Sequence, residues 1–230
     1  IATAEAEDFD WKKILDGAQW FHFTGITPAL SESAARICLE ACEAANELGV
    51  TVSCDLNFRK NLWTSERANE VMGGLMPYVK LLIANEEDCE MVFGIKADDT
   101  DITTGSLSHD GYKSVAKKVS ERFGIEKVAI TLRESVSASF NRWAGMLYDG
   151  NDYHFSKKYD ITIVDRVGGG DSFGGGLIYA LTENYQPQDA IDFAVAASCL
   201  KHTIENDFNE ITVDEVKNLM KGDGSGRVQR

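Results

Sequence analysis

The most informative stretch of the chain is Asp165-Arg-Val-Gly168-Gly169-Gly170-Asp171-Ser172-Phe173-Gly174-Gly175-Gly176, where two runs of glycine flank an aspartate. A strand is predicted to end at Val164, just before it, and a helix is predicted to begin within it. Glycine inside a helix costs about 1 kcal/mol relative to alanine. Because local preference and predicted structure disagree here, the stretch is a candidate functional site.

The glycine run predicts an anion-binding site built from backbone. Gly168 to Gly170 would leave the unpaired N–H groups and the positive dipole end of the helix open to a ligand. A transferring phosphoryl group suits such a site, because amide groups can hold its charged oxygens. Asp171, a carboxylate at neutral pH, could accept a proton from a substrate hydroxyl. A tight glycine turn with an acidic helix cap explains the same residues without a ligand, and the run alone leaves both interpretations open.

Known glycine motifs narrow the chemistry. The run contains neither GxxxxGK[ST] nor GxGxxG, two nucleotide-binding motifs. Gly170 to Gly174 does match GxSxG, the nucleophile elbow of serine hydrolases. A Ser172 nucleophile, an Asp189 or Asp192 acid and a His202 base would follow in the right chain order. However, no strand is predicted after the run and His202 falls in a helical pattern, so the hydrolase is the weaker alternative.

Outward from this run, helical and strand patterns alternate along the chain. Strands are predicted at 20–23, 50–54, 79–84, 127–132 and 162–164, with a hairpin formed by 137–140 and 143–148. Helices are predicted at 31–48, 67–75, 86–93 and 113–123, and throughout 171–220. This alternation predicts an α/β fold with a mostly parallel sheet covered on both faces. We expect one domain over 1–221 and a flexible tail over 222–230.

Composition argues against several classes of protein. The formal net charge of −14 disfavours a nucleic-acid partner, because phosphate binding relies on clustered Lys and Arg. No stretch approaches the roughly 18 to 20 apolar residues that a membrane span needs. The five cysteines are scattered, without a CxxC pair, which favours a reducing compartment and predicts a cytoplasmic protein. The four histidines show no metal-ligand spacing.

At the glycine run the sequence resembles a known family. Asp165 to Asp171 is similar to the second signature of the PfkB (ribokinase-like) carbohydrate kinases, and DRVGGGDSF is similar to the variant in members that phosphorylate 2-keto-3-deoxygluconate. Further segments resemble the same subgroup: Asp55-Leu-Asn57-Phe-Arg59, Leu82 to Asp88, Val128 to Ser135, Lys201-His-Thr and the terminal GSGRVQR. Their order and spacing together make the resemblance specific.

The resemblance implies a three-layer α/β/α fold and transfer of a phosphoryl group from Mg²⁺·ATP to the 6-hydroxyl of 2-keto-3-deoxygluconate. Gly168, Gly169 and Gly170 would form the anion hole, and Asp171 would be the base. Arg59 would neutralise phosphate or the substrate carboxylate, which suits its forked, permanently charged guanidinium. Two further residues are assigned by resemblance to substrate binding, namely Asn57 and Thr24.

For nucleotide and metal, the resemblance implies a second group of residues. Asn85 would position Mg²⁺ and phosphate through water, together with the fourth residue of its motif. That residue is Asp88 here rather than Glu, so either Asp88 or Glu87 is expected to take the role. A solvated acidic first turn that complements a helix dipole explains the same residues. The remaining assignments are to the nucleotide for Thr131, Arg133, Ser198 and Lys201, and to a monovalent cation such as K⁺ for Asp165.

The chain departs from the family pattern at its beginning. PfkB kinases start with a strand, a glycine-rich first motif and a small β lid, and Ile1 aligns partway through that pattern. The resemblance therefore predicts a fragment, a processed product or an incompletely observed protein, with an exposed sheet edge and poor or absent catalysis. It also predicts a homo-oligomer when full length. Two alternatives remain, namely another PfkB kinase acting on fructose, ribose or a ketogluconate, and a fragment that binds nucleotide or sugar without turnover.

Overall fold

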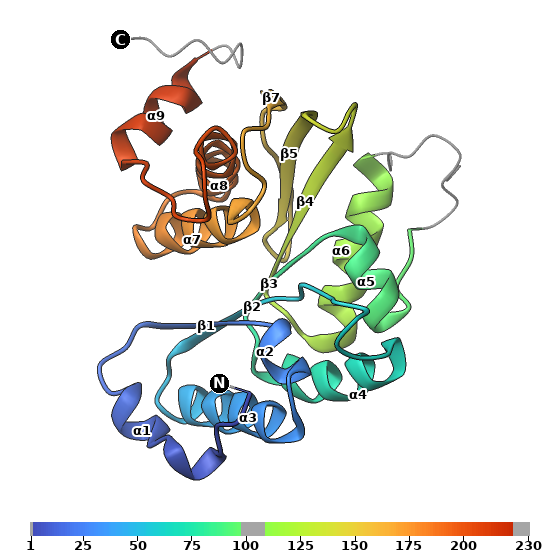
Figure 1. Ribbon diagram of the computed structural model, residues 1–230, viewed down its shortest axis with the longest axis vertical. Coiled ribbons are helices and arrows are strands. Elements are labelled where there is room, and N and C mark those ends of the chain that lie inside the picture. The colour runs from blue at the N-terminus through green and yellow to red at the C-terminus, as the bar shows by residue number, and fades with distance from the viewer. Residues whose placement is uncertain (1, 98–108, 223–230) are drawn as a thin grey trace. The chain divides into compact units, whose positions relative to one another are not determined.

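The computed structural model describes residues 2–97 and 109–222, which form two compact units (Figure 1). Unit 1 comprises the described residues up to 128, and unit 2 comprises 129–222. The single domain over 1–221 stays a prediction. Residues 223–230 of the predicted tail, and the acidic loop with Asp98, Asp99 and Asp101, lie outside the described residues.

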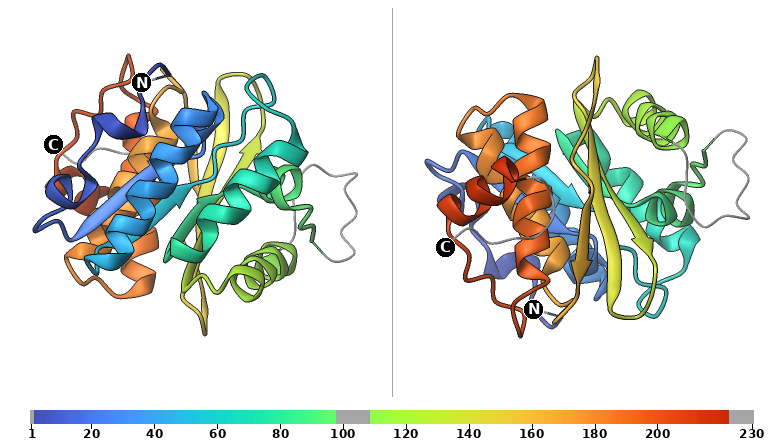
Figure 2. Two further views of the ribbon diagram at one scale, coloured as in Figure 1. Left: turned by 90° about the horizontal axis from the view of Figure 1, so that it is seen from below. Right: turned by 90° about the horizontal axis from the view of Figure 1, so that it is seen from above.

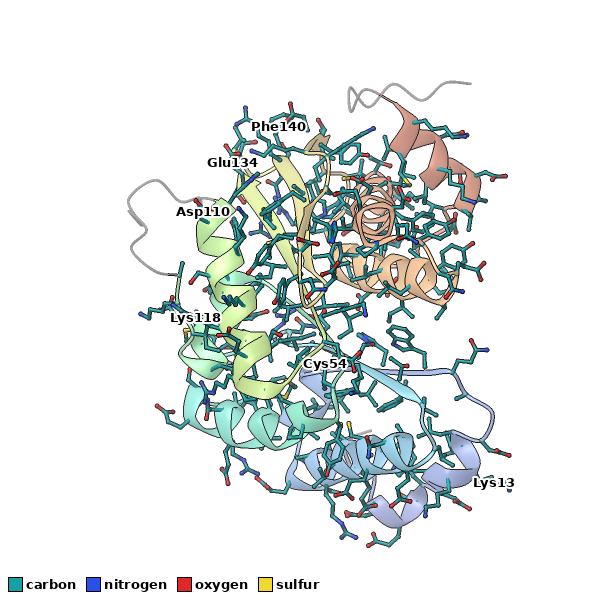
Figure 3. The ribbon with its side chains drawn as sticks, turned by 180° about the vertical axis from the view of Figure 1, so that it is seen from behind. Lys13, Cys54, Asp110, Lys118, Glu134 and Phe140 are labelled. Carbon is teal, nitrogen blue, oxygen red and sulfur yellow. The ribbon has the colours of Figure 1, made fainter. Side chains whose placement is uncertain are left out.

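Unit 1 contains three strands that pair in parallel, in the order β1 (Trp20–Thr24), β2 (Thr51–Asp55) and β3 (Leu81–Ala84). Cys54 of β2, labelled in Figure 3, pairs with Phe23 on one side and with Leu82 on the other, and it is fully buried. Every residue of β3 is buried. A continuous apolar run is what a parallel strand covered on both faces requires, so this part of the prediction is confirmed.

Helices follow each of these strands, and their ends are set by local chemistry. Ser31 begins α3 by accepting the N–H of Ala34 at 3.0 Å, and Gly49 follows its end with a φ of +71°. Both are favoured end signals. The α-helices of unit 1 are α1 (Trp11–Ile14), α2 (Ile26–Ala29), α3 (Glu32–Glu47), α4 (Ser65–Leu75), α5 (Glu86–Phe93) and α6 (His109–Phe123), and its 3₁₀ helices are η1 (Ala6–Asp8) and η2 (Met76–Tyr78). None of the described helices has the length and apolar composition needed to cross a membrane.

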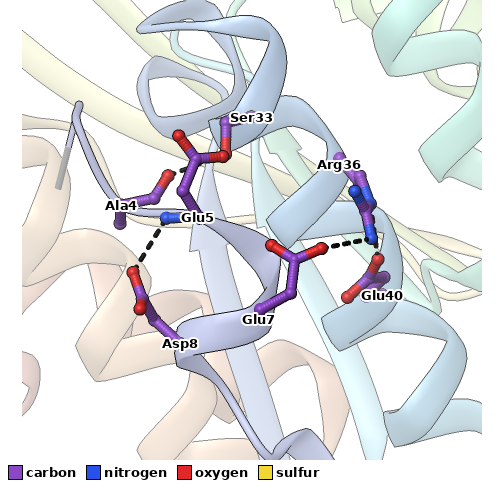
Figure 4. A network of polar contacts seen from close by, with 7 residues as sticks. All are labelled: Ala4, Glu5, Glu7, Asp8, Ser33, Arg36 and Glu40. Carbon is purple, nitrogen blue, oxygen red and sulfur yellow. Dashed lines mark hydrogen bonds and ion pairs between the residues drawn. The ribbon is translucent and has the colours of Figure 1, made fainter.

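The first residues of unit 1 lie against α3 through polar contacts (Figure 4). The hydroxyl of Ser33 donates to the carbonyl oxygen of Ala4 at 2.7 Å. Arg36 donates to the carboxylates of Glu7 and Glu40, at 3.1 and 2.8 Å. Such exposed ion pairs contribute about 0 to 1 kcal/mol each, so they orient this segment more than they stabilise it.

Unit 2 combines antiparallel strands with a layer of helices. Strand β4 (Lys127–Ser135) continues into this unit, and β5 (Phe140–Tyr148) pairs antiparallel with both β6 (Tyr153–Phe155) and β7 (Tyr159–Thr162). Figure 3 labels Glu134 on β4 and Phe140 at the start of β5. The helices α7 (Gly169–Thr182), α8 (Pro187–Lys201) and α9 (Val213–Lys221) lie on one side of these strands (Figure 2). The α/β class is confirmed, with a mixed rather than uniformly parallel pairing.

Two glycines bring the layers of unit 2 into close contact. A Cβ atom at Gly176 of α7 would lie 3.2 Å from the Cα atom of Ala194 and 3.1 Å from the Cβ atom of Ala197, both on α8. A Cβ atom at Gly145 of β5 would lie 2.8 Å from the side chain of Val195. The absence of a side chain at both positions therefore lets α7 and β5 pack closely against α8.

Several predictions in unit 2 are wrong. Helix was predicted throughout 171–220, but residues 183–186 and 202–212 lie outside α7, α8 and α9. Residues 137–139 form the turn of the hairpin rather than an arm, because the hydroxyl of Ser137 accepts the N–H of Phe140 at 3.1 Å and closes it. Strand β7 ends at Thr162, because the N–H of Val164 donates instead to the carbonyl of His202 at 2.8 Å. Strand β6, which is short and lies between polar residues, was not predicted.

Candidate active site

The glycine run forms the start of α7, as predicted, and two separate features require a glycine at its first position, Gly168. Gly168 caps the helix with a φ of +78°, in the left-handed region that favours glycine. A Cβ atom there would also lie 2.4 Å from the carbonyl oxygen of Asp207. Conformation and close contact thus both require a glycine, and the loop ends in one defined geometry.

Beyond this cap, backbone groups of α7 face outward. The first bond of the helix ladder runs from the N–H of Ser172 to the carbonyl of Gly168, at 2.8 Å, so the N–H groups of Gly170 and Asp171 point out of the helix end. Gly170 is exposed, and a Cβ atom added there would meet nothing within 4 Å. Unlike Gly168, Gly170 has no packing reason to be glycine, and its missing side chain leaves room for a ligand.

Asp171 stands exposed beside a cleft of about 410 Å³. The cleft belongs entirely to unit 2, and its walls include Gly168, Asp171, Tyr179, Phe193, Phe208 and Val216. Phe208 is 78% exposed and forms part of this wall, so its ring is open to a ligand in the cleft. An apolar cleft with an anion-binding helix end at its edge has the form of a nucleotide site.

Buried polar groups support the glycine run from below. The hydroxyl of Ser198 donates to the carbonyl of Gly169 at 2.8 Å. The ring of His202 lies beneath Gly169, where an added Cβ would be 2.5 Å from it, and its Nδ1 donates to the carbonyl of Ser198 at 2.6 Å. Burial, assisted by nearby positive charges such as Lys201, lowers the pKa of His202, so its ring is neutral at pH 7.

Ser198 and Lys201 were expected to flank the adenine, but both are fully buried. Their polar atoms are turned toward backbone, Ser198 toward Gly169 and the Lys201 ammonium toward the carbonyl oxygens of Ile204 and Asn206. Buried groups with these partners are placed to hold the loop, not to touch a ligand. Thr131 and Arg133, in contrast, lie on β4 with their side chains half-buried and exposed, respectively.

The serine hydrolase alternative does not fit this geometry. Ser172 lies inside α7 and is buried, and its hydroxyl accepts the side-chain N–H of Asn209 at 2.6 Å. His202 uses its Nδ1 atom on the carbonyl of Ser198. Asp192 accepts hydrogen bonds from the backbone of Lys157 and the side chain of Gln188, on α8. Ser172, His202 and Asp192 therefore have other partners, and a buried serine inside a helix does not form a nucleophile elbow.

Unit 1 carries its own group of candidate residues, where β1, β2 and β3 end. Ligands of open α/β sheets bind outside the carboxyl ends of parallel strands. Thr24 ends β1, and its hydroxyl accepts the side-chain N–H of Asn57 at 3.1 Å. Asn57 follows β2 with a φ of +40°, and Gly25 lies so close to this segment that a Cβ atom would be 2.2 Å from the carbonyl oxygen of Leu56. The structure thus brings Thr24 and Asn57 together.

Asp88 joins the same strand ends from α5. Asn85 caps this helix by accepting the N–H of Asp88 at 2.7 Å, and its own amide donates back to the Asp88 carboxylate at 3.1 Å. Asp88 is buried, and burial raises its pKa to about 6, although Arg59 and a backbone hydrogen bond from Phe58 act in the opposite direction. Arg59 and Glu87 are exposed. Asp88 therefore links α5 to the loop after β2 and is not solvated, whereas Glu87 fits the alternative of a solvated acidic first turn.

The residues assigned to metal ions do not form a ready-made group of metal ligands in the described part of the chain. Within residues 2–97 and 109–222, no three His, Cys, Asp or Glu side chains are grouped so as to bind a metal. Asp165 uses both carboxylate oxygens on the chain itself, accepting the N–H of Val167 at 2.9 Å and that of Asn206 at 3.0 Å. These bonds, with the first the largest influence, lower the pKa of Asp165.

Sequence reasoning missed several residues of this site. Asp207, Phe208 and Asn209 follow α8 in a stretch that was predicted to be helical but is not, and all three line the cleft. His202 was considered only as a hydrolase base. The one available signal was its place in the Lys201-His-Thr segment.

Comparisons with known proteins agree with this geometry. A 2-dehydro-3-deoxygluconokinase from Thermotoga maritima, solved by crystallography, is 50% identical, with a TM-score of 0.91 over 96% of this chain and 65% of its own. A 2-dehydro-3-deoxygalactonokinase from Haloferax volcanii is 29% identical over 93% of this chain and 60% of its own length. A candidate ribokinase II from Escherichia coli, solved in complex with ATP and Mg²⁺, is 18% identical with a TM-score of 0.70 over 93% of this chain and 61% of its own, which shows the fold alone.

The chain thus spans less than two thirds of each of these relatives. A family model for the pfkB family carbohydrate kinases matches residues 1–207, nearly the whole of the described chain. This match covers the strand ends of unit 1 and the glycine run of unit 2. The chain belongs to the pfkB family of carbohydrate kinases.

Proposed function

We propose that the protein containing this chain transfers a phosphoryl group from Mg²⁺·ATP to the 6-hydroxyl of 2-keto-3-deoxygluconate (2-dehydro-3-deoxygluconate), giving the 6-phosphate and ADP. The observation that carries the proposal is the start of α7, where outward N–H groups and exposed Asp171 stand at the edge of a cleft. The 50% identity to a kinase of this name supports the choice of substrate.

The chemistry follows from the groups at this helix end. Outward N–H groups of Gly170 and Asp171 hold the oxygens of the phosphoryl group, on which negative charge is spread during transfer. The Asp171 carboxylate orients the sugar hydroxyl and takes its proton as the new O–P bond forms and the bond to ADP breaks. The cleft beside it, with the exposed Phe208, accommodates the nucleotide.

The strand ends of unit 1 and the exposed part of β4 complete the proposed assignments. We assign the sugar acid to Arg59, Asn57 and Thr24, because a guanidinium binds a carboxylate through two parallel bonds. Mg²⁺ usually keeps several waters and binds substrate phosphates with one or two carboxylates, which suits water-mediated roles for Asn85 with Asp88 or Glu87. The nucleotide is assigned to Thr131 and Arg133.

Release of ADP by the complete gene product tests the reaction. The acceptors are 2-keto-3-deoxygluconate, its C4 epimer 2-keto-3-deoxygalactonate, gluconate, fructose and ribose. We expect the highest kcat/KM with the first, and a fall of about 10²- to 10⁴-fold in kcat for Asp171→Asn, since a general base contributes that much. Asp189→Asn is the matched control, because Asp189 is an exposed acid in the first turn of α8.

Each outcome of this panel separates one alternative. A higher kcat/KM with the C4 epimer, fructose or ribose would keep the kinase and replace the substrate. ATP binding without ADP release from any acceptor would favour the non-catalytic binding fragment. Equal kcat for wild type and Asp171→Asn would remove Asp171 as the base.

The compartment and the assembly state of the protein are also proposed. All five cysteines are free and buried, and this usage supports the proposed place in the cytoplasm. A homo-oligomer, and the absence of nucleic-acid and membrane partners, stay predictions. Sedimentation of the complete gene product measures the first of these.

A further inference from the structure

Lys201 presents a charge in an unusual place. It is the last residue of α8, and its side chain has no exposed surface. Lysine is almost never fully buried unless its ammonium is paired. Here the ammonium donates to the carbonyl oxygen of Asn206 at 2.6 Å and to that of Ile204 at 3.2 Å. Nearby Asp165 contributes the opposite charge, and the attraction of Lys201 helps to lower the pKa of its carboxyl.

These groups form one cluster around the first glycine of α7. The Asp165 carboxylate accepts the N–H of Asn206 at 3.0 Å, so it binds the same segment as the ammonium does. The next residue of that segment, Asp207, places its carbonyl against Gly168. The Cε atom of Lys201 lies 3.3 Å from the position a Gly168 Cβ would take. We call Lys201, Asp165, Gly168 and the segment 204–207 the ammonium cluster.

The cluster has the composition of a monovalent-cation site that is already filled. K⁺ is bound by carbonyl and carboxylate oxygens, and here an ammonium occupies two of the carbonyls. The carboxylate of Asp165 is also committed, because each of its oxygens accepts a backbone N–H. The residues present therefore do not fit a free K⁺ ion beside Asp165, although the family resemblance suggests one.

We propose that the Lys201 ammonium is a built-in cation that fixes the segment 204–207 and, through it, the phosphoryl-binding turn at Gly168, so that the kinase needs no added K⁺. This inference rests on the proposed function. Lys201 is a positioning residue, because its buried ammonium acts through the backbone of its neighbours and does not reach the cleft. Removing its charge would leave the carbonyl oxygens of Ile204 and Asn206 without this donor, and the Asp165 carboxylate without its counter-charge, so the segment 204–207 would lose the group that ties it to α8.

The first test compares salts with the wild-type complete gene product. ADP release and the Kd of a non-hydrolysable ATP analogue are measured in KCl, NaCl and tetramethylammonium chloride at one ionic strength, with all nucleotides as K⁺-free salts. We expect kcat and Kd to be equal in all three. A kcat or an affinity that depends on K⁺ would overturn the proposal. The binding measurement keeps it testable even if no sugar on the panel is phosphorylated, in which case only the proposed function fails.

The second test compares two variants that lack the Lys201 ammonium, one that leaves a cavity in its place and one that fills the cavity. Lys201→Ala opens a cavity that a small cation can enter, whereas Lys201→Met fills most of it without charge. For both we expect kcat to fall by more than about tenfold, as for loss of oriented charge-stabilising groups, with the sugar KM little changed. K⁺, NH₄⁺ or methylammonium should restore Lys201→Ala but not Lys201→Met, and tetramethylammonium should restore neither.

Controls separate this role from general destabilisation. Lys221→Met removes an exposed positive charge from α9 of the same unit and should leave kcat unchanged. Thermal unfolding should show Lys201→Ala gaining stability in KCl relative to tetramethylammonium chloride, and this readout remains if the variant is too unstable for assay at higher temperature. A Lys201→Ala protein that unfolds at the same temperature in both salts, and stays equally inactive in them, would overturn the proposal.

Discussion

The strand ends of unit 1 and the helix start of unit 2 present polar groups in different ways, the first through side chains and the second through the backbone. In unit 1 the candidate groups are side chains that form hydrogen bonds with one another. Asn57 donates to Thr24, and Asn85 donates to Asp88. In unit 2 the binding groups are backbone N–H groups of the glycine run, and the side chains Ser198, Lys201 and His202 lie beneath it. The first site should therefore respond to loss of single hydrogen bonds, and the second to changes in backbone geometry.

The largest stability effect is expected where backbone geometry is changed directly, in Gly168→Ala. A left-handed φ costs a non-glycine residue about 1 to 2 kcal/mol, and relieving the contact with Asp207 adds about 1 to 3 kcal/mol. We therefore expect the free energy of unfolding to fall by about 2 to 5 kcal/mol, as backbone strain can cause, and kcat to fall with it. Urea unfolding followed by circular dichroism measures the first.

Gly170→Ala is the matched control for that change. The same methyl group meets nothing within 4 Å there, and alanine is favoured over glycine in a helix by up to about 1 kcal/mol. The variant should be at least as stable as wild type but should bind the ATP analogue less tightly, because the methyl group occupies the ligand's space. Unchanged stability in Gly168→Ala, or unchanged affinity in Gly170→Ala, would contradict the division between packing and binding glycines.

Asp88 tests the side-chain site of unit 1 through pH. Its pKa of about 6 in the folded protein lies above its ordinary value, so its contribution to stability is complete at low pH and is lost as pH rises through about 6. At 1.36 kcal/mol per pKa unit, the loss between pH 3.5 and 7.5 is about 2 to 3 kcal/mol. Asp88→Asn should not show this loss of stability. Between pH 3.5 and 7.5, the unfolding free energy of the variant should therefore rise relative to that of the wild type by the same amount.

Glu87→Gln provides the control for this measurement, since Glu87 is the exposed neighbour on the same helix. Its difference from wild type should not show the shift. Parallel pH profiles of stability for Asp88→Asn and wild type would show that Asp88 is not buried as described.

The smallest effect is expected at Thr24, where one hydrogen bond between side chains is at stake. Thr24→Val keeps the shape of the side chain and removes the hydroxyl that accepts from Asn57. We expect a loss of about 1 kcal/mol in unfolding free energy and a higher KM for the sugar acid with little change in kcat. Thr27→Val, on the neighbouring α2, is the control. A larger effect on kcat than on KM would move Thr24 out of the substrate-binding group.

Most of the architecture could be predicted because it depends on local signals. The helix over 86–93 was predicted with its observed ends, since Asn85 and Gly94 are strong start and stop signals. The glycine run and Asp171 also emerged from sequence, because glycine inside a helix conflicts with local preference. Helix α8 was predicted, but not the orientation of its polar residues.

The orientation of Ser198 and Lys201 depends on tertiary packing that periodicity does not encode. Nearly every residue in the second half of α8 is buried, so no polar face marks which side meets the solvent. A lysine at a helix end is ordinarily exposed. Only the return of the chain at 204–207 supplies the carbonyl oxygens that make its burial possible, and that segment was predicted as part of a helix.

The near contact of α8 with Gly176 and Gly145 gives the glycine run a stiff base. At Gly176 the nearest atoms of α8 are the Cβ of Ala197 and the Cα of Ala194, so α7 has little room to move toward α8. Oriented amide dipoles stabilise developing charge most when they need not move during the reaction. On the proposed function, the absence of a side chain at Gly176 and at Gly145 would thus help to keep the reorganisation energy of phosphoryl transfer small, because the amide groups are already held in place before the nucleotide binds.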